Sequence, residues 1–337
     1  MVSDRERLTP QLECDFTGKT MINRVLLALL AVAFALPVQA QSWPQRSVKL
    51  IIPLGPGAGA DIVARLLADR LQKRWGQPVV VENRPGGDAI PALTQFTTAN
   101  DDHTMLVAPA STFIAHPLQY AKLAYNPKDV MPVARVSNTV VAISVPVALG
   151  VSNLAEFVAI AKKDPGKLNF HAITSLNDLQ FQAFLKIAGL DVVRVPYRDG
   201  VQALNDLAEN RIQAYSSAFA VARPQVQAGK VKVIAVTNTQ RTDTVPGVAT
   251  ATEQGHPALE FDGLVGFFST PIINLGLREK IAKDVVEFSG DAEIVSRLTA
   301  TAQIVNPGGP TEFGAALDRQ RAGAAETVRI VGFKAAQ

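Results

Sequence analysis

The residues best suited to chemistry form a glycine-rich loop at 53–60, between an apolar stretch and a helical pattern. Glycines let a backbone approach a ligand closely, and the first turn of the following helix offers unpaired N–H groups at the positive end of its dipole. An anion fits such a place. Asp61 could ligate a cation or act as a base, but a carboxylate there also satisfies backbone N–H groups, and we favour that structural role.

Two functional interpretations of this loop compete with a plain strand-to-helix connection. The spacing Gly55-x-Gly57-x-x-Ala60 fits a loose dinucleotide-binding pattern, and Glu82 lies about 20 residues on, near the place of a ribose-binding acid. Pro56 argues against it, because its ring fixes φ and removes a donor. The second interpretation is a loop that binds a small carboxylate. From this stretch alone the interpretations stay open.

Other reactive side chains form no recognisable set. The histidines, His103, His116, His171 and His256, lie far apart, so we expect loop or surface histidines and no metal site. The sequence has no Gly-x-Ser-x-Gly motif, and Ser216 and Ser217 have no neighbouring base. The sequence therefore predicts no enzyme and no cofactor.

Short β-branched stretches alternate with helical patterns from residue 48 to residue 236, which predicts parallel sheets flanked by helices. A helical pattern begins at Asp61, with Val63, Leu67, Leu71 and Trp75 on one stripe, and Gly76 follows as its stop. Ser111 and Thr112 follow a strand at 104–108, where each could cap a helix or face a ligand; capping is the favoured interpretation. The predicted strands are 48–52, 79–81, 104–108, 168–173, 191–195, 212–216 and 231–236.

Two long extended stretches indicate two lobes. Residues 133–145 lack a helical period and are long enough to cross from one lobe to the other, and residues 259–269 return. Two helices remain, at 274–288 and 311–331. We predict an α/β fold in which residues 42–142 and 262–337 form lobe 1 and residues 143–261 form lobe 2. Loops at the carboxyl ends of strands then meet in a cleft, which favours a binding site.

The composition describes a globular chain with a targeting segment. Lys and Arg exceed Asp and Glu by 33 to 30, and no basic tract occurs, so a nucleic-acid partner is not expected. A charged start at 21–24, an apolar run at 25–36 and Val38-Gln39-Ala40 predict a signal peptide cleaved after Ala40. Residues 1–20 are either an upstream extension or untranslated. We expect a freely soluble periplasmic monomer.

Many short blocks in register resemble the solute receptors of tripartite tricarboxylate transporters, also called the Bordetella uptake receptor family. The resemblance spans nearly all of residues 43–337. It implies a two-lobed, type II-like periplasmic binding protein, each lobe a mainly parallel sheet flanked by helices, with two crossover strands. The implied function is capture of a small carboxylate or related metabolite for membrane subunits. The blocks are Trp43-Pro44, 48–61, 76–86, Tyr125-Asn126-Pro127, 164–170, Val195-Pro196-Tyr197, 229–231, 236–237, Arg241, 245–246 and 253–255.

The resemblance and the cleft argument together predict the ligand-binding residues. In the family, one loop from each lobe grips the ligand largely through backbone N–H groups and ordered water. The predicted residues are Leu54, Gly55, Gly57, Ala58, Gly59, Ala60, Asp61, Ser111, Thr112, Thr174, Ser175, Tyr197 and Ser217.

Both loops depart from the family pattern. Ala60 stands where a hydroxyl is usual, residues 87–91 replace a glycine run, residues 171–178 replace a Gly- and Ser-rich loop, and Ser217 replaces an aspartate. Asp178 would disfavour a nearby carboxylate if it faced the cleft. We therefore predict a divergent receptor with an atypical ligand. The alternatives are an NAD-type oxidoreductase and a periplasmic sensor without transport.

Overall fold

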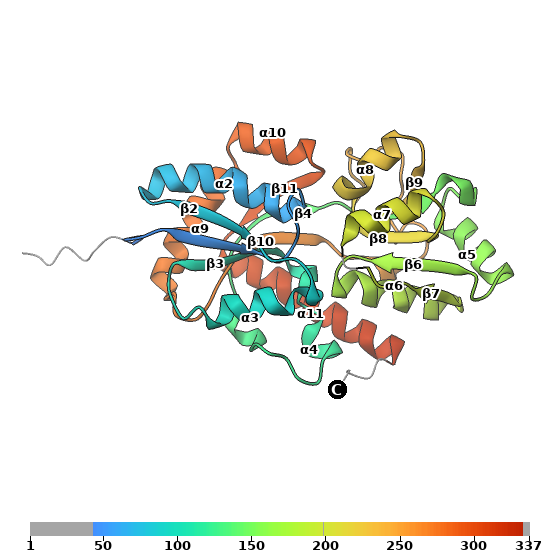
Figure 1. Ribbon diagram of the computed structural model, residues 1–337, viewed down its shortest axis with the longest axis horizontal. Coiled ribbons are helices and arrows are strands. Elements are labelled where there is room, and N and C mark those ends of the chain that lie inside the picture. The colour runs from blue at the N-terminus through green and yellow to red at the C-terminus, as the bar shows by residue number, and fades with distance from the viewer. Residues whose placement is uncertain (1–42, 198, 333–337) are drawn as a thin grey trace, which may run out of the picture. The chain divides into compact units, whose positions relative to one another are not determined.

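The computed structural model describes residues 43–197 and 199–332. The predicted signal peptide and upstream extension lie outside these residues. Residues from Arg46 onward belong to one compact unit, which contains two β-sheets. We call the six-stranded sheet with its helices lobe 1 and the five-stranded sheet with its helices lobe 2 (Figure 1).

Lobe 1 is built on a sheet with the strand order β11-β4-β10-β3-β1-β2. Figure 1 shows α2 and α10 above this sheet and α3 and α11 below it. Its strands are β1 (Val48–Ile52), β2 (Val79–Asn83), β3 (Thr104–Pro109), β4 (Met131–Thr139), β10 (Gly263–Ser269) and β11 (Gln303–Gly308). Its helices are α2 (Gly59–Trp75), α3 (Ile90–Thr98), α4 (His116–Gln119), α9 (Leu275–Ser289), α10 (Ala292–Ala300) and α11 (Pro310–Val331), with the short 3₁₀ turns η1 (Gly87–Ala89), η2 (Ala110–Thr112) and η3 (Pro127–Asp129).

Lobe 2 has the strand order β7-β6-β8-β5-β9. Its core includes a stacked pair, Phe170 and Phe181, with ring centroids 4.6 Å apart. Its strands are β5 (Val141–Pro146), β6 (Leu168–Ala172), β7 (Val192–Arg194), β8 (Ala214–Ala218) and β9 (Val231–Val236). Its helices are α5 (Leu154–Lys163), α6 (Ser175–Ala188), α7 (Gly200–Ala208) and α8 (Phe219–Gln227), with the 3₁₀ turns η4 (Val147–Leu149) and η5 (Pro257–Leu259).

Both sheets are mixed, whereas the sequence predicted mainly parallel sheets. β1 pairs parallel with β2 and β3, and β6 pairs parallel with β7 and β8. β4, β5 and β10 lie next to the crossovers between the lobes. Each of them pairs only antiparallel with its neighbours in its own sheet. The β-α alternation predicted the parallel part correctly, and it carries no information on the direction in which a crossover strand enters the other sheet.

The first predicted unit is confirmed. β1 is followed by α2, whose inward residues Val63, Leu67 and Leu71 are fully buried, and Gly76 ends the helix in the left-handed conformation at φ 69°. Such an end suits glycine, which has no Cβ to clash.

The prediction of only two elements after residue 274 was wrong, because it missed α10 and β11. The side chain of Asp291 caps α10 by accepting from the N–H groups of Glu293 and Ile294, which is a signal present in the sequence. β11 is an edge strand that contains Pro307, and its inner residues are only half-buried, so no apolar alternation marks it.

The chain passes between the lobes at Val140, between the end of β4 and the start of β5. It returns between η5 and β10. The lobe boundaries at 142/143 and 261/262 stay predictions. Among the described helices, none combines the length and the hydrophobicity that crossing a membrane requires.

Candidate ligand-binding site

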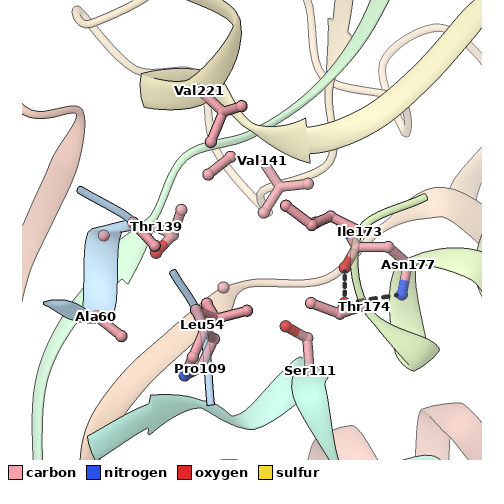
Figure 2. Close-up of a pocket in the computed structure, with 14 residues that line it drawn as sticks. Leu54, Ala60, Pro109, Ser111, Thr139, Val141, Ile173, Thr174, Asn177 and Val221 are labelled. Carbon is pink, nitrogen blue, oxygen red and sulfur yellow. Dashed lines mark hydrogen bonds between the residues drawn. The ribbon is translucent and has the colours of Figure 1, made fainter. Parts of the chain in front are cut away.

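A pocket of about 40 Å³ lies where the loops of both lobes meet (Figure 2). Lobe 1 contributes the loop before α2 and the end of β3, and lobe 2 contributes the start of α6 and residues around β8 and α8. The residues that line it are Leu54, Ala58, Gly59, Ala60, Pro109, Ser111, Thr139, Val141, Ile173, Thr174, Asn177, Ala218, Val221 and Gly263.

The start of α2 forms one wall of this pocket. Ala58, Gly59 and Ala60 all line it, and the N-cap residue Ala58 offers no side-chain hydrogen bond to the helix. A 17-residue helix therefore begins at the pocket, and no side chain of the described residues caps its first N–H groups. That arrangement favours an anion, because the N–H groups and the positive end of the helix dipole both attract negative charge.

Close packing against Gln303 favours glycine at position 59. A Cβ atom there would lie 2.2 Å from Nε2 of Gln303, a side chain in β11 that is 1% exposed. Gln303 is held in place, because its Oε1 accepts hydrogen bonds from the hydroxyls of Ser137 and Thr139. The missed strand β11 therefore shapes the start of α2.

The Asp61 side chain forms hydrogen bonds that hold the glycine-rich loop in place. Its carboxylate accepts from the N–H of Gly57 at 2.9 Å, from Nδ2 of Asn83 at 2.9 Å and from Nε of Arg65 at 3.0 Å. Burial raises the pKa of Asp61, but the hydrogen bonds from Arg65, Gly57 and Asn83 outweigh it, so the net shift lowers the pKa. These contacts agree with the favoured structural role for Asp61.

The opposite wall belongs to the start of α6. Thr174 caps this helix: its Oγ1 lies 3.4 Å from the N–H of Asn177 and donates to Oδ1 of Asn177 at 2.6 Å. Figure 2 shows both side chains beside Ser111, with Ile173 and Val141 above them. This end of the pocket is polar and uncharged.

No residue that lines the pocket in the described part of the chain carries a charge. The wall between the two polar ends is apolar and includes Leu54, Val141, Ile173 and Val221. A bound carboxylate would thus meet neutral donors and a helix terminus, and the body of the ligand would meet aliphatic side chains.

Part of the predicted site lines the pocket and part does not. Leu54, Ala58, Gly59, Ala60, Ser111 and Thr174 line it, whereas Gly55, Gly57, Asp61, Thr112, Ser175, Tyr197 and Ser217 do not. The roles of all these residues in ligand binding stay predictions.

Polar side chains outside the lining have other partners. The single hydroxyl hydrogen of Ser175 is shared between two acceptors, Oδ1 of Asp88 at 3.1 Å and the carbonyl of Thr112 at 2.9 Å. The Tyr197 hydroxyl donates to Asp206 at 2.8 Å, and the buried Ser217 hydroxyl lies 3.4 Å from the carbonyl of Ala218.

Sequence reasoning missed the remaining lining residues. Thr139 and Val141 flank the crossover, Pro109 and Ala218 end β3 and β8, and Gly263 begins β10. Their places at strand ends were a usable signal for a site. The others that the prediction omitted are Ile173, Asn177 and Val221.

The favoured interpretation of Ser111 and Thr112 as helix caps was wrong. The η2 turn that contains them has no side-chain cap, and α4 begins four residues after Thr112, at His116, with Ala115 as its N-cap. Ser111 instead lines the pocket, and the buried Thr112 hydroxyl has no hydrogen-bond partner among the residues that the structure describes.

Asp178 does not face the pocket. Its carboxylate accepts from Nε of Arg194 at 2.7 Å and from Nε2 of Gln182 at 2.8 Å. Burial raises the pKa of Asp178, and Arg194 opposes that shift. Its charge is thus matched by Arg194, so the condition for repelling a ligand carboxylate is not met.

The expectation of loop or surface histidines was wrong for His116 in α4 and His171 in β6, which are at most 6% exposed. His103 is also buried, but it lies in the loop before β3, as expected. Each ring lies near a polar partner; Nδ1 of His116, for example, is 2.8 Å from the Tyr125 hydroxyl. Partners of this kind allow imidazoles to be buried. Within residues 43–197 and 199–332, no group of three acidic, histidine or cysteine side chains could hold a metal ion.

Glu82, the candidate ribose-binding acid, is not part of the pocket lining. It pairs with Lys49 at 3.1 Å and Arg84 at 2.5 Å and accepts from Gln95 at 3.3 Å. These contacts hold the carboxylate at the end of β2.

Comparisons with known proteins agree on one family. The model of the tripartite tricarboxylate transporter family receptor matches residues 63–293. The chain is 30% identical over 250 residues to a UPF0065 protein of Bordetella bronchiseptica, covering 70% of this chain and 75% of that protein.

Solved structures give the same result. The periplasmic binding protein BugD matches with 25% identity and a TM-score of 0.78, covering 87% of this chain and 100% of that one. MatC from Rhodopseudomonas palustris with bound malate matches with 25% identity and a TM-score of 0.75, covering 86% of this chain and 100% of that one. The family model spans more than half of the sequence, and the fold has the two lobes of these binding proteins. The chain belongs to the tripartite tricarboxylate transporter receptor family.

Proposed function

We propose that this protein is a periplasmic receptor that binds a small carboxylate in the pocket between its lobes and delivers it to the membrane subunits of a tripartite transporter. The observation that carries the proposal is the start of α2, which forms a wall of the pocket without a side-chain cap. Malate bound to the related MatC supports a carboxylate ligand.

The neutral lining narrows the ligand class. One helix terminus can receive one carboxylate, and among the described residues neither end of the pocket offers a Lys or Arg side chain for a second. Leu54, Val141 and Ile173 favour an aliphatic body, and Ser111, Thr174 and Asn177 favour a neutral polar group at the far end. We therefore expect a short monocarboxylate with a hydroxyl or amide group in preference to a dicarboxylate.

A thermal-shift series of equal chain length tests this class. The compounds are 4-hydroxybutyrate, butyrate, succinate and butyramide, with L-malate and NAD added. A ligand that binds only the folded state raises the melting temperature by mass action. We expect 4-hydroxybutyrate or butyrate to raise it in a dose-dependent way and butyramide to have no effect.

Each other outcome has a definite meaning. A stronger response to succinate or L-malate keeps the receptor and overturns the monocarboxylate preference. A response to NAD alone favours a dinucleotide-binding protein, and silence across the series contradicts a carboxylate receptor.

The remaining parts of the proposal concern export, assembly and chemistry. N-terminal sequencing of periplasmic protein should begin at Gln41 if cleavage follows Ala40. Light scattering should give a monomer, and cells that lack the gene should lose uptake of the bound compound. The bound compound should be recovered unchanged after long incubation, because the protein acts as a receptor and not as an enzyme.

A further inference from the structure

A buried asparagine holds the first crossover. Asn238 follows β9 in lobe 2 and is 1% exposed. Its Nδ2 donates to the carbonyl of Thr139 at 3.1 Å, and its Oδ1 accepts from the N–H of Val141 at 3.1 Å. These two backbone groups flank Val140, where the chain leaves β4 and enters β5. We propose that Asn238 is the positioning residue that fixes the hinge between the lobes.

The same segment also holds the second crossover. Nδ2 of Asn238 lies 3.4 Å from Oδ1 of Asp262, and Oγ1 of Thr239 donates to Oδ2 of Asp262 at 3.3 Å. The N–H of Phe261 donates to the carbonyl of Thr237 at 2.9 Å. Residues 237–239 therefore bind both chain segments that connect the lobes.

The chemistry of the side chain explains why asparagine suits this place. Its amide carries a donor and an acceptor on one short planar group, as a peptide unit does. Aspartate keeps the acceptor and loses the donor, and alanine loses both. Leaving a buried backbone group without a partner is unfavourable, so the two hydrogen bonds with Asn238 stabilise the crossover in this geometry.

The hinge is connected to the pocket wall. The side chains of Thr139 and Val141 line the pocket while their backbone groups bind Asn238. Gly263, next to Asp262, also lines it, and a Cβ at that position would lie 2.7 Å from the carbonyl of Thr139. A change in hinge angle therefore moves three lining residues together. The consequence for affinity rests on the proposed function, whereas the hinge role does not.

Two variants and one matched control test the hinge role without any ligand. Asn238→Ala removes both hydrogen bonds, and Asn238→Asp removes only the donor. The control is Gln254→Ala: Nε2 of Gln254 donates to the carbonyl of Ile234 at 2.9 Å and its Oε1 accepts from the N–H of Leu154 at 2.8 Å. The control loses the same kinds of bond, but both lie inside lobe 2.

The lobe separation is measured by electron spin resonance on the full chain with Cys14 replaced by Ser. Spin labels at the exposed Lys73 in α2 and Lys163 in α5 report the distance between lobes. We expect Asn238→Ala and Asn238→Asp to broaden the distance distribution and Gln254→Ala to leave it unchanged. Hydrogen exchange of the Val141 amide should become on the order of tenfold faster in Asn238→Ala and stay slow in Asn238→Asp.

The proposal is overturned if both Asn238 variants keep the parent distance distribution, or if Gln254→Ala broadens it equally. If Asn238→Ala fails to fold, Asn238→Asp decides between these outcomes. A failure of every carboxylate to bind would leave these distances informative, so the hinge role and the receptor function are tested separately.

Discussion

The Ser175 hydroxyl donates a hydrogen bond to Oδ1 of Asp88 at 3.1 Å, which joins α6 of lobe 2 to the η1 turn of lobe 1. Asp88 has a φ of 51°, in the left-handed region that residues other than glycine rarely adopt. Its second oxygen accepts from the Tyr120 hydroxyl at 2.8 Å. Two hydroxyls thus stabilise a strained turn at the contact between the lobes.

Removing this contact should favour separated lobes. We expect Ser175→Ala to lower the free energy of unfolding by about 1 kcal/mol and to increase the mean radius of gyration in small-angle X-ray scattering. Ser289→Ala is the control, because its buried hydroxyl donates to the carbonyl of Val285 within α9. An equal scattering change in both variants would argue against a role for Ser175 between the lobes.

Asp61 should be needed for the shape of the glycine-rich loop. We expect Asp61→Ala to lower the free energy of unfolding by about 1 to 3 kcal/mol, because Gly57, Asn83 and Arg65 lose their common acceptor. Urea unfolding measures the change. Asp69→Asn, at an exposed position of the same helix, should stay within about 0.5 kcal/mol of the parent. A harmless Asp61→Ala change would refute the structural role.

Stability should depend on pH through His171. Burial lowers the pKa of His171 to about 4, although the hydrogen bond to the carbonyl of Val195 acts in the opposite direction. In the unfolded chain the histidine has a pKa of about 6.5, so between pH 4 and pH 6.5 the unfolded chain binds more protons than the folded chain. His171 therefore contributes stability that is present above about pH 6.5 and is lost as the pH falls towards 4.

Unfolding free energies measured from pH 4 to pH 7 check this dependence. The full loss is on the order of 3 kcal/mol. His171→Gln should flatten the profile in this range, because the variant has nothing to protonate at that position. His256→Gln is the comparison at a half-buried position. A His171→Gln profile as steep as that of the parent would assign the pH dependence to other groups.

Gly59 and Gln303 should show coupled effects. Gly59→Ala places a methyl group against Nε2 of Gln303. Moving the Gln303 side chain away weakens the hydrogen bonds that its Oε1 accepts from Ser137 and Thr139. We expect a loss of about 1 to 3 kcal/mol in unfolding free energy. Adding Gln303→Ala should make the Gly59→Ala step much less costly, and a double-mutant cycle measures this coupling.

The matched control is Gly323→Ala in α11. Apart from the neighbouring helix backbone, no heavy atom of the described residues lies within 4 Å of a Cβ at that exposed helical position. Alanine there should raise stability by about 0.5 to 1 kcal/mol, because glycine loses more entropy on forming a helix. Additive effects of Gly59→Ala and Gln303→Ala would contradict the packing argument.

Local pattern was enough to predict most elements, because strand and helix periods, caps and stops are encoded by neighbouring residues. Val48–Ile52, the apolar stripe of α2 and Gly76 carried that information. Asn153 is a similar local signal, because its side chain caps α5 by accepting from the N–H of Glu156, three residues on. The sequence did not predict α10 and β11, because a short capped helix and a half-buried edge strand with Pro307 give weak local patterns.

By itself, the sequence determined the two-lobed α/β class and, through many short blocks, the family; the loop before α2 as a place for an anion stays a prediction. Tertiary structure alone decided which side chains line the pocket. Thr174 and Asn177 line the pocket. Their sequence neighbours Ser175 and Asp178 do not, and bind Asp88 and Arg194 instead. Thr139, Val141 and Gln303 reach the site because β4, β5 and β11 meet there, and such pairings depend on residues far apart in the chain.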